Sequence, residues 1–520
     1  MRVSKTLLIF LSSLFMTVTY NYTFFVKSFD VFGSYSFLFS LGVTLFLFIA
    51  LLIVLFDSKW SLKPFIIFFF LLGSITAYFT NEYGVIIDDK MIQNTFETDI
   101  SESAGLFSFK LLVYFLFLGV LPSYFVVNAK IDYPSFKRNI IYKIKMFIII
   151  VSLLGLNIYL FSKAYTSFFR EYKILRFQTI PTYPFYSLGY YLHKKYWTKK
   201  IPFTKIGEDA KLIKSEGKPK LMIFILGEAA RWDHFSINGY EKETNPLMQS
   251  DSEIVSLKNF YSCGTETAVS VPCMFSDLTR KEYSDKKAKN RSSLIDVLKS
   301  AGVRVLWIDN NSDSKGVAVR IKNYKSIKDS CDGECRDEVM LKGLKEFLKE
   351  PKTTFIVLHQ MGSHGPEYYK RYDKKYEKFK PVCKTNQLQK CSKDEISNAY
   401  DNTIVYTDFF IEEVKKLLKD ESKKYKVALW YASDHGESLG ENGIYLHGLP
   451  YFIAPEAQKH PASVLWFSDE FGVKNKCIKN LSEKKLSQDN IFSSVLGVMG
   501  VETKVYNENL DMFKKCKVNE

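Results

Sequence analysis

Hydrophobic residues are distributed unevenly along the 520 residues, with long apolar stretches before about residue 165 and short ones after it. Each early stretch has about the length that an α-helix needs to cross a bilayer, roughly 17 to 25 residues. We therefore predict five membrane-spanning helices, at about residues 7–26, 37–55, 64–79, 111–127 and 145–160. The first follows Arg2 and Lys5, as a secretory signal would. It is too long for such a signal and lacks a small-residue cleavage site, so we expect it to remain as an anchor.

Basic residues in the connecting loops predict the orientation of these helices, because cytoplasmic loops carry an excess of lysine and arginine. Lys59 and Lys63 lie between the second and third helices, and the segment between the fourth and fifth is richer still in basic residues. The opposite loop, residues 81–103, is acidic and is expected to face outward. Five crossings that start in the cytoplasm then leave everything after residue 161 outside it.

Beyond residue 219 the pattern changes to short apolar runs that alternate with stretches of helical periodicity. The runs LMIFIL, VRVLWI, TTFIVL, KVALWY and SVLWF are typical of strands covered on both faces. The helical segments between them are SLIDVLKSAG, DEVMLKGLKEFLKE and DFFIEEVKKLLKD. We therefore predict an α/β domain with a mainly parallel central sheet at residues 220–520. Residues 162–219 mix aromatic and basic side chains, which indicates amphipathic helices bridging this domain to the membrane domain of residues 1–161.

Cysteine spacing gives an independent indication of the compartment. None of the eight cysteines falls in the predicted membrane segments, and six form close pairs: Cys263 with Cys273, Cys331 with Cys335, and Cys383 with Cys391. Cys477 and Cys516 remain as a fourth candidate pair. Zinc-binding thiolates are the alternative, but such sites use paired CxxC-like knuckles, which the sequence lacks. We therefore expect disulfides and an oxidising compartment.

The net charge of +15 does not by itself indicate a nucleic-acid partner. Much of the excess lies in the predicted cytoplasmic loops and in the lysine-rich soluble part. Attraction to anionic membrane surfaces is the simpler explanation, so we expect membrane partners and no nucleic acid.

Residues capable of catalysis follow several of the predicted strands. Ligands of such sheets bind beyond the carboxyl ends of the strands, so one crevice could collect these residues. Glu228 follows the first run, and Asp434 with His435 follows the fourth; two carboxylates and an imidazole suit zinc. The stretch YSCGTETAVSVPCMFS adds a hydroxyl between two cysteines, and a divalent cation would lower the pKa of that hydroxyl enough for nucleophilic attack. Thr265 and Thr267 both fit this role, and their spacing leaves the choice open.

Further polar residues lie in loops where a ligand could approach the backbone. His364 and His447 stand beside glycines and are predicted to bind phosphate or a second metal ion. Asn311 and Lys315, in DNNSDSKG, are candidate phosphate contacts. Three other histidines have no such context and are interpreted as structural: His193, His234 and His460. His359 begins the segment 359–364, which follows the third apolar run at the predicted crevice.

Five blocks of sequence together resemble the membrane-anchored phosphoethanolamine transferases, zinc enzymes of the alkaline phosphatase and sulfatase superfamily. The blocks are GEAARWDHFSINGY at 227–240, CGTETAVSVPCMFS at 263–276, DNNSDSKG at 309–316, GSHGP at 362–366 and SDHGESLGENGIYLHG at 433–448. The resemblance covers nearly the whole chain. It implies an N-terminal five-helix transmembrane bundle and a C-terminal α/β sulfatase-like domain with a mainly parallel central sheet.

The resemblance also implies roles for single residues. Thr267 would be the nucleophile that becomes modified with phosphoethanolamine, and Glu228, Thr267, Asp434 and His435 would hold one zinc ion. Glu266, between the two threonines, carries a negative charge that this scheme does not explain.

Other residues would contact the substrates. The resemblance places His364 and His447 at the phosphate or at a second zinc ion, with Asn311 and Lys315 nearby in the substrate pocket. It assigns three residues of the acidic outer loop to the cationic ethanolamine head group: Asn94, Thr98 and Glu102.

The implied reaction is ping-pong. Thr267 attacks the phosphorus of phosphatidylethanolamine from the outer leaflet, diacylglycerol leaves, and an acceptor then takes phosphoethanolamine from Thr267. The resemblance favours lipid A as acceptor. Its modification would lower the negative charge of the outer membrane and so weaken the action of cationic peptides such as polymyxin. Core sugars, glycans or a protein are alternative acceptors. We expect a monomeric, multi-pass enzyme of the bacterial inner membrane with its catalytic domain in the periplasm.

Three alternatives fit parts of the pattern. A glycerolphosphate transferase of the lipoteichoic acid synthase type shares the five-helix plan, but the block at 263–276 argues against it. A sulfatase requires a cysteine or serine in a CxPxR setting, which the sequence VPC at 271–273 does not supply. A membrane scaffold with an inactive enzyme domain would not need the complete set of metal ligands.

Overall fold

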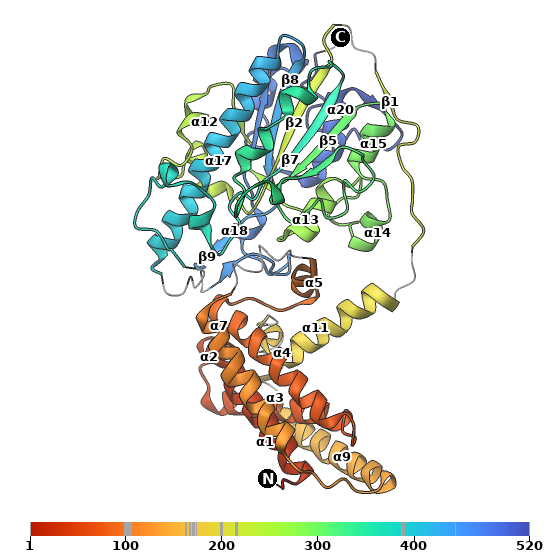
Figure 1. Ribbon diagram of the computed structural model, residues 1–520, viewed down its shortest axis with the longest axis vertical. Helices are drawn as coiled ribbons and strands as arrows, with labels where there is room; N and C mark the ends of the chain where they lie inside the picture. The colour runs from red at the N-terminus through yellow and green to blue at the C-terminus, as the bar shows by residue number, and fades with distance from the viewer. Residues whose placement is uncertain are drawn as a thin grey trace. The chain divides into compact units, whose positions relative to one another are not determined.

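The computed structural model (Figure 1) describes residues 2–97, 107–161, 164–165, 168, 172, 174–197, 201–213, 217–385, 388, 391–441 and 444–518. The chain divides into two compact units, and each is described here by itself. The first comprises Met1–Phe96 and Leu106–Thr198, and the second comprises Glu97–Gly105 and Lys199–Glu520. The segment 162–219 is thus shared between the units, and its interfacial role stays a prediction.

The first unit is helical. Its helices are α1 (Lys5–Tyr20), α2 (Tyr22–Phe32), α3 (Tyr35–Leu55), α4 (Leu62–Tyr83), α5 (Asp89–Glu97), α7 (Phe109–Tyr114), α8 (Leu121–Asn128), α9 (Phe136–Leu160) and α11 (Thr182–Leu192). A π-helical turn, Phe115–Val120, joins α7 to α8. Among the described residues, four stretches are long and apolar enough to cross a membrane, and the bent pair of α1 and α2 makes a fifth if it counts as one span. The predicted five-helix bundle agrees with this upper count.

Asn21 breaks the first predicted span into two helices inclined at 64°. Its side-chain amide donates to the carbonyl oxygens of Met16 (3.0 Å) and Ile180 (2.8 Å), and its Oδ1 accepts the N–H of Ile180 (2.7 Å). The buried asparagine thereby satisfies backbone groups that the break would leave unpaired. The local sequence could not predict this bend, because one partner lies 159 residues away.

A buried ion pair joins the start of α1 to the end of α3. Lys5 Nζ lies 2.7 Å from Asp57 Oδ2, and both side chains are buried. The same ammonium group donates to Asn139 of α9 and lies 3.8 Å from the centre of the Tyr142 ring. One cation therefore contacts three segments that are far apart in the sequence.

Replacing Lys5 with methionine is expected to destabilise the first unit by about 3–5 kcal/mol, because the buried Asp57 carboxylate loses its charge partner. Thermal unfolding of the purified full-length protein in detergent would measure the loss. The double variant Lys5→Met/Asp57→Leu should recover much of it, since neither charge then remains buried. An unchanged unfolding temperature in the single variant would contradict a stabilising role of the pair.

The second unit contains a seven-stranded sheet in the order β3-β11-β8-β2-β7-β5-β6. Its strands are β2 (Lys220–Gly227), β3 (Val255–Ser256), β5 (Arg304–Asp309), β6 (Tyr324–Ser326), β7 (Thr354–His359), β8 (Lys426–Ser433) and β11 (Ser463–Phe467). Smaller pairings involve β1 (Lys211–Leu212), β4 (Phe260–Tyr261), β9 (Ser438–Leu439), β10 (Tyr445–Leu446), β12 (Leu486–Ser487) and β13 (Val501–Glu502). The five apolar runs predicted as strands are the five longest strands of this sheet: β2, β5, β7, β8 and β11. The prediction of a mainly parallel sheet is confirmed.

The helices of this unit are α12 (Pro246–Ser250), α13 (Thr267–Met274), α14 (Asp285–Lys289), α15 (Leu294–Ser300), α16 (Leu344–Phe347), α17 (Lys393–Glu421), α18 (Glu456–Lys459), α19 (Asn475–Lys479) and α20 (Ile491–Met499). Residues of α15 and α20 pack with Phe224, Trp307 and Trp430 in one hydrophobic core. The long helix α17 packs on β8 from the opposite side of the sheet (Figure 1). Covering on both faces accounts for the continuous apolarity of the strands.

One local expectation was wrong, and the direction of one strand had not been predicted. The last run, β11, is antiparallel to β8. The described residues between them form β9, β10 and the four-residue α18 rather than a long crossover helix. The segment DEVMLKGLKEFLKE is not one helix but a 3₁₀ turn, Asp337–Leu341, followed by α16. Gly343 separates the two with a positive φ of 84°, a conformation that an α-helix does not contain.

All eight cysteines are paired, as the sequence predicted. The bridges are Cys263–Cys273, Cys331–Cys335, Cys383–Cys391 and Cys477–Cys516. The first connects the segment before α13 to a residue within that helix, so it closes the short loop that carries Thr265 and Thr267.

Candidate active site and metal centre

Strand register brings the first two candidate ligands together. β2 and β8 are parallel neighbours, and their last residues, Gly227 and Ser433, are paired in register. Glu228 is the first residue after β2 and Asp434 the first after β8, so both lie at the carboxyl edge of the sheet. The N–H of Ala229 donates to Asp434 Oδ1 (3.2 Å) and ties the two turns to each other.

The side chains of Glu228, Thr267, Asp434 and His435 converge on one point. Thr267 Oγ1, at the first residue of α13, lies 3.0 Å from Glu228 Oε2 and 3.5 Å from His435 Nε2. His435 Nε2 lies 3.3 Å from Glu228 Oε1 and 3.4 Å from Asp434 Oδ2. Both carboxylates and the imidazole are fully buried.

This donor set fits a tetrahedral metal ion. Zinc bonds of 2.0–2.2 Å at tetrahedral angles place neighbouring ligand atoms about 3.3 Å apart, close to the separations found here. Glu228 Oε1 and Asp434 Oδ2 are buried, and apart from the shared His435 Nε2 at 3.3 and 3.4 Å they have no hydrogen-bond partner among the described residues. Because buried carboxylate oxygens are costly without a partner, these two atoms are suited to bind a cation.

Burial and neighbouring charges set the protonation of the cluster. Burial raises the pKa of Asp434 to about 6, and the negative charge of Glu228 contributes in the same direction. Burial opposes the charged form of His435, but the carboxylates of Asp434 and Glu228 outweigh it and raise the pKa of His435 to about 10. Burial also opposes ionisation of Glu228, yet the hydrogen bond and charge of His435 hold the pKa of Glu228 well below its usual range. The cluster therefore attracts positive charge, which a proton or a divalent cation can supply.

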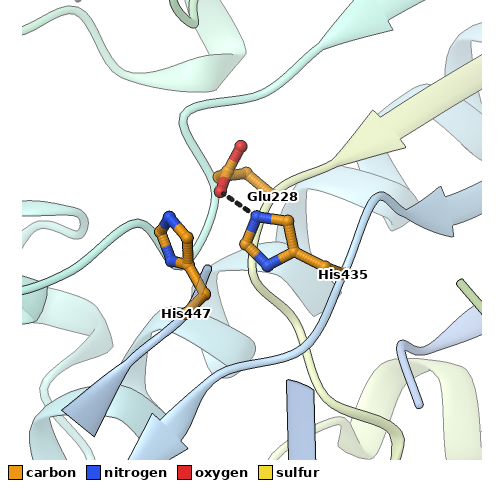
Figure 2. A group of neighbouring side chains, drawn as sticks. All are labelled: Glu228, His435 and His447. Atoms are coloured by element: carbon orange, nitrogen blue, oxygen red, sulfur yellow. Dashed lines mark ion pairs between the residues drawn. The ribbon is translucent and has the colours of Figure 1, made fainter. Parts of the chain in front are cut away.

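His447 lies beside these ligands, with its ring centre 4.3 Å from that of His435. Figure 2 shows the Glu228 carboxylate directed at His435, with the ring of His447 alongside. Glu228, His435 and His447 offer ligand atoms that all lie within 4.8 Å of one another, so they form a group that could hold a metal ion. His364 lies near His447, and the centres of the two rings are 5.7 Å apart.

The buried Glu437 orients His447. Glu437 Oε2 lies 3.4 Å from His447 Nδ1, which leaves the other ring nitrogen, Nε2, for a ligand or metal ion. Sequence analysis had not singled out Glu437, because a glutamate in a glycine-rich loop gives no sign of burial.

The predicted substrate residues lie in different surroundings. Asn311 Nδ2 donates to Glu228 Oε2 and to the carbonyl of Gln360, both at 2.9 Å, so its amide holds Glu228 in place. Lys315 is half-buried in a left-handed conformation, with its N–H donating to the Asp313 carboxylate. Asn94 lies on α5 of the first unit, whereas Thr98 and Glu102 fall outside the described residues. Substrate contacts by these residues stay predictions.

The two threonines that the sequence left open have different environments. Thr265 Oγ1 donates to the carbonyl of Leu449 at 2.6 Å, whereas the Thr267 hydroxyl faces Glu228 and His435. Glu266 is buried at the start of α13, where a negative charge is favoured by the helix dipole. This position gives its charge a structural reason that the sequence did not reveal.

Other buried residues support the site; the sequence analysis missed Asp309 and Gln488, and it noted the position of His359 without giving it a role. Asp309 and His359 end β5 and β7, are paired in register, and join through Asp309 Oδ2 and His359 Nδ1 at 2.9 Å. Their positions at the ends of two apolar runs could have indicated this contact. Gln488 donates to the carbonyls of Ser433 (3.0 Å) and Asp434 (2.7 Å) while accepting the N–H of Cys263 (2.7 Å). No signal in the sequence marks Gln488.

Substituting Gly436 with alanine is expected to disrupt the metal centre. An added Cβ would lie 2.0 Å from the carbonyl oxygen of Ala457, and backbone at that distance must move. Because Gly436 follows His435 directly, we expect metal affinity to fall by about 10–100-fold or more. Zinc titration against a competing chelator would measure this. Gly333→Ala is a matched control, since Gly333 has a positive φ of 89° but open space around it; an equal loss there would refute the steric explanation.

Comparison with known proteins identifies the family. The family described as phosphoethanolamine transferase EptA/EptB matches residues 45–196, and the sulfatase family matches residues 220–501. Phosphoethanolamine transferase EptA of Escherichia coli strain K12 is 39% identical over 494 residues, which cover 92% of this chain and 90% of that protein. Phosphatidylethanolamine transferase Mcr-1 of Escherichia coli is 39% identical over 492 residues, with 91% of each chain covered.

A solved structure is similar over the same extent. It is the integral membrane protein lipooligosaccharide phosphoethanolamine transferase A (EptA) from Neisseria meningitidis, with a TM-score of 0.96 and 31% sequence identity. The match covers 99% of this chain and 100% of that one. Together with the candidate metal centre at the carboxyl edge of a mainly parallel sheet, these similarities show that the chain belongs to the phosphoethanolamine transferases of the alkaline phosphatase superfamily.

Proposed function

We propose that this protein transfers phosphoethanolamine from phosphatidylethanolamine to lipid A through a covalent intermediate on Thr267. The observation that supports this most directly is the convergence of the Thr267 hydroxyl with Glu228, Asp434 and His435 in a buried cluster. A hydroxyl that shares its contacts with two carboxylates and an imidazole has the surroundings of an activated nucleophile.

Zinc is the metal that this donor set suits best, and Glu228, Thr267, Asp434 and His435 would hold it. When bound, it would lower the pKa of the threonine hydroxyl and neutralise negative charge on the phosphoryl group. His364 and His447 would bind the phosphoryl oxygens or a second ion. Asn311 would keep the Glu228 carboxylate oriented through its 2.9 Å hydrogen bond.

In the first half-reaction, Thr267 Oγ1 forms a bond to phosphorus, and the bond between phosphorus and the glycerol oxygen breaks. Diacylglycerol departs with a proton, and phosphoethanolamine stays on Thr267. In the second half-reaction, an acceptor oxygen takes the group, and the threonine hydroxyl regains a proton. The N-terminus of α13 and the two histidines would stabilise the charge that develops on the phosphoryl oxygens.

The proposed acceptor follows from chemistry and from the relatives. The meningococcal relative is named as a lipooligosaccharide phosphoethanolamine transferase, and lipid A is the phosphorylated lipid part of lipooligosaccharide. A donor and an acceptor that both reside in a membrane would explain why the catalytic domain is attached to apolar helices. We place the protein in the bacterial inner membrane as a monomer, with the second unit in the periplasm.

Intact-mass measurement of the purified full-length protein tests the mechanism. Incubation with phosphatidylethanolamine should add the mass of one phosphoethanolamine group to the wild type and none to Thr267→Ala. Addition of lipid A should then remove the added mass and modify the lipid. Release of diacylglycerol and free phosphoethanolamine without an adduct would instead indicate direct hydrolysis and refute the covalent route.

A further inference from the structure

We infer that the first unit contains a binding site for an anionic phospholipid, at the end of the helices where α1 begins and α8 ends. The charge pattern of the connecting loops predicts that this end faces the cytoplasm. The site shares no residue with the candidate metal centre, so it does not depend on the proposed transfer reaction.

The site begins with an apolar cavity of about 480 Å³ that is lined by residues of α1, α4 and the stretch Phe109–Asn128, and by Val3 and Ala129 just outside these helices. Ser12 and Asn128 are the polar residues of the lining, which otherwise consists of aliphatic, aromatic and proline side chains. Three lining residues are more than half exposed: Leu11 (52%), Phe117 (61%) and Phe125 (64%). The cavity therefore opens at the outer surface of the helices, where a membrane supplies acyl chains. Its volume lies within the range of ligand sites, roughly 300–1,000 Å³.

An irregular stretch of helix forms one wall of the cavity. Phe117 belongs to the π-helical turn Phe115–Val120, and Pro122 follows one residue after that turn. Such turns are rare and often accompany functional sites. Gly119 packs closely against α4, since a Cβ there would lie 2.6 Å from Ser74 Oγ. The irregular stretch is thus held against α4 on one side and leaves the cavity on the other.

Two basic residues adjoin the lining of the cavity, and their backbones are paired. The lining residues Val3 and Ala129 are the chain neighbours of Arg2 and Lys130, and both basic side chains are exposed. The Val3 N–H donates to the Lys130 carbonyl at 3.1 Å, and Arg2 and Lys130 face each other in an isolated parallel bridge. Like charges in directly opposed positions are destabilising. Neither side chain forms an ion pair with any carboxylate in the part of the chain that the structure describes.

An anionic phospholipid satisfies both features at once. Its phosphate would lie between Arg2 and Lys130, and one acyl chain would fill the cavity. Phospholipids of the cytoplasmic leaflet reach this position, and each basic residue near a membrane surface favours an anionic lipid. A zwitterionic lipid offers the same chain but its own cation opposes the two basic side chains, so the site should select by head-group charge.

Native mass spectrometry of the full-length protein in mixed micelles can count retained lipids and give their dissociation constants. Phosphatidylglycerol and phosphatidylcholine with identical acyl chains are the probes, because phosphatidylcholine is not the donor of the proposed reaction. We expect one tightly retained phosphatidylglycerol, and a loss of affinity of roughly thirty-fold in Arg2→Gln/Lys130→Gln.

Matched variants separate the site from general charge effects. Lys137→Gln/Arg138→Gln removes the same charge from exposed positions of α9 and should retain phosphatidylglycerol as the wild type does. Ser12→Phe narrows the cavity and should lower the affinity for both lipids, whereas Ser12→Ala should leave both affinities unchanged. Equal affinity of the wild type for both lipids would overturn the inference. So would an unchanged affinity in Arg2→Gln/Lys130→Gln, or an equal loss in the α9 variant.

Discussion

Replacing Glu228 with glutamine is expected to prevent a metal ion from binding at the candidate site and to lower transfer activity by about a thousand-fold or more. Glutamine keeps the size of the side chain and can still accept from Thr267 and Asn311, which both donate to Oε2. It loses the negative charge and replaces Oε1, which faces His435 at 3.3 Å, with a neutral group. The cluster then holds one carboxylate instead of two, so its attraction for a divalent cation falls sharply.

Elemental analysis for zinc and an assay of diacylglycerol release would measure the two effects in one preparation. Glu421→Gln is the matched control, because Glu421 is also buried but lies just before β8, at the amino end of the sheet. We expect that variant to keep both metal and activity. A Glu228→Gln protein that binds zinc as the wild type does would show that Glu228 is not a ligand.

Replacing Thr267 with valine is expected to abolish the covalent adduct and to lower activity by about 10⁴-fold, while much of the bound metal remains. Valine has nearly the same shape as threonine but no hydroxyl, and three other candidate ligands are untouched: Glu228, Asp434 and His435. Thr267→Ser restores a hydroxyl at the same place and should retain activity within about ten-fold of the wild type. This pair of variants separates loss of the nucleophile from loss of the metal.

Thr265→Val provides the control for position. The Thr265 hydroxyl donates to the Leu449 carbonyl, so its removal should cost about 1 kcal/mol of stability and leave the adduct intact. Intact mass after incubation with phosphatidylethanolamine gives the result for all three variants. If Thr267→Val still formed the adduct and Thr265→Val did not, Thr265 rather than Thr267 would be the nucleophile.

The local pattern of the chain was sufficient for much of the fold. Runs such as LMIFIL and KVALWY are apolar throughout because β2 and β8 are covered on both faces, and this burial leaves a clear mark in the sequence. The apolar stretches of the first unit and the close cysteine pairs are equally local signals. The direction of a strand was harder to predict, because β11 resembles its neighbours in composition and yet pairs antiparallel with β8.

The candidate site shows the same division. Glu228, Asp434 and His435 follow apolar runs, so the rule that ligands bind at the carboxyl ends of strands was enough to select them. Thr265 and Thr267 could not be distinguished in this way, because the choice depends on which hydroxyl α13 directs at Glu228. The roles of three further residues could not be predicted from the sequence either: Gln488, Glu437 and Asn21. Each forms its hydrogen bond with a partner that only the fold brings close.

The sequence by itself determined that this protein has apolar helices, an α/β domain, four disulfides and the set of residues from which a metal site could be built. These properties depend on the composition and spacing of neighbouring residues, which the unfolded chain already contains. Only the tertiary structure decided which side chains meet. The pairing of β2 with β8 aligns Glu228 and Asp434, and the Cys263–Cys273 bridge and Gln488 fix the segment before Thr267 beside them. A metal centre requires atoms from distant segments to lie a few ångströms apart, and packing alone sets those distances.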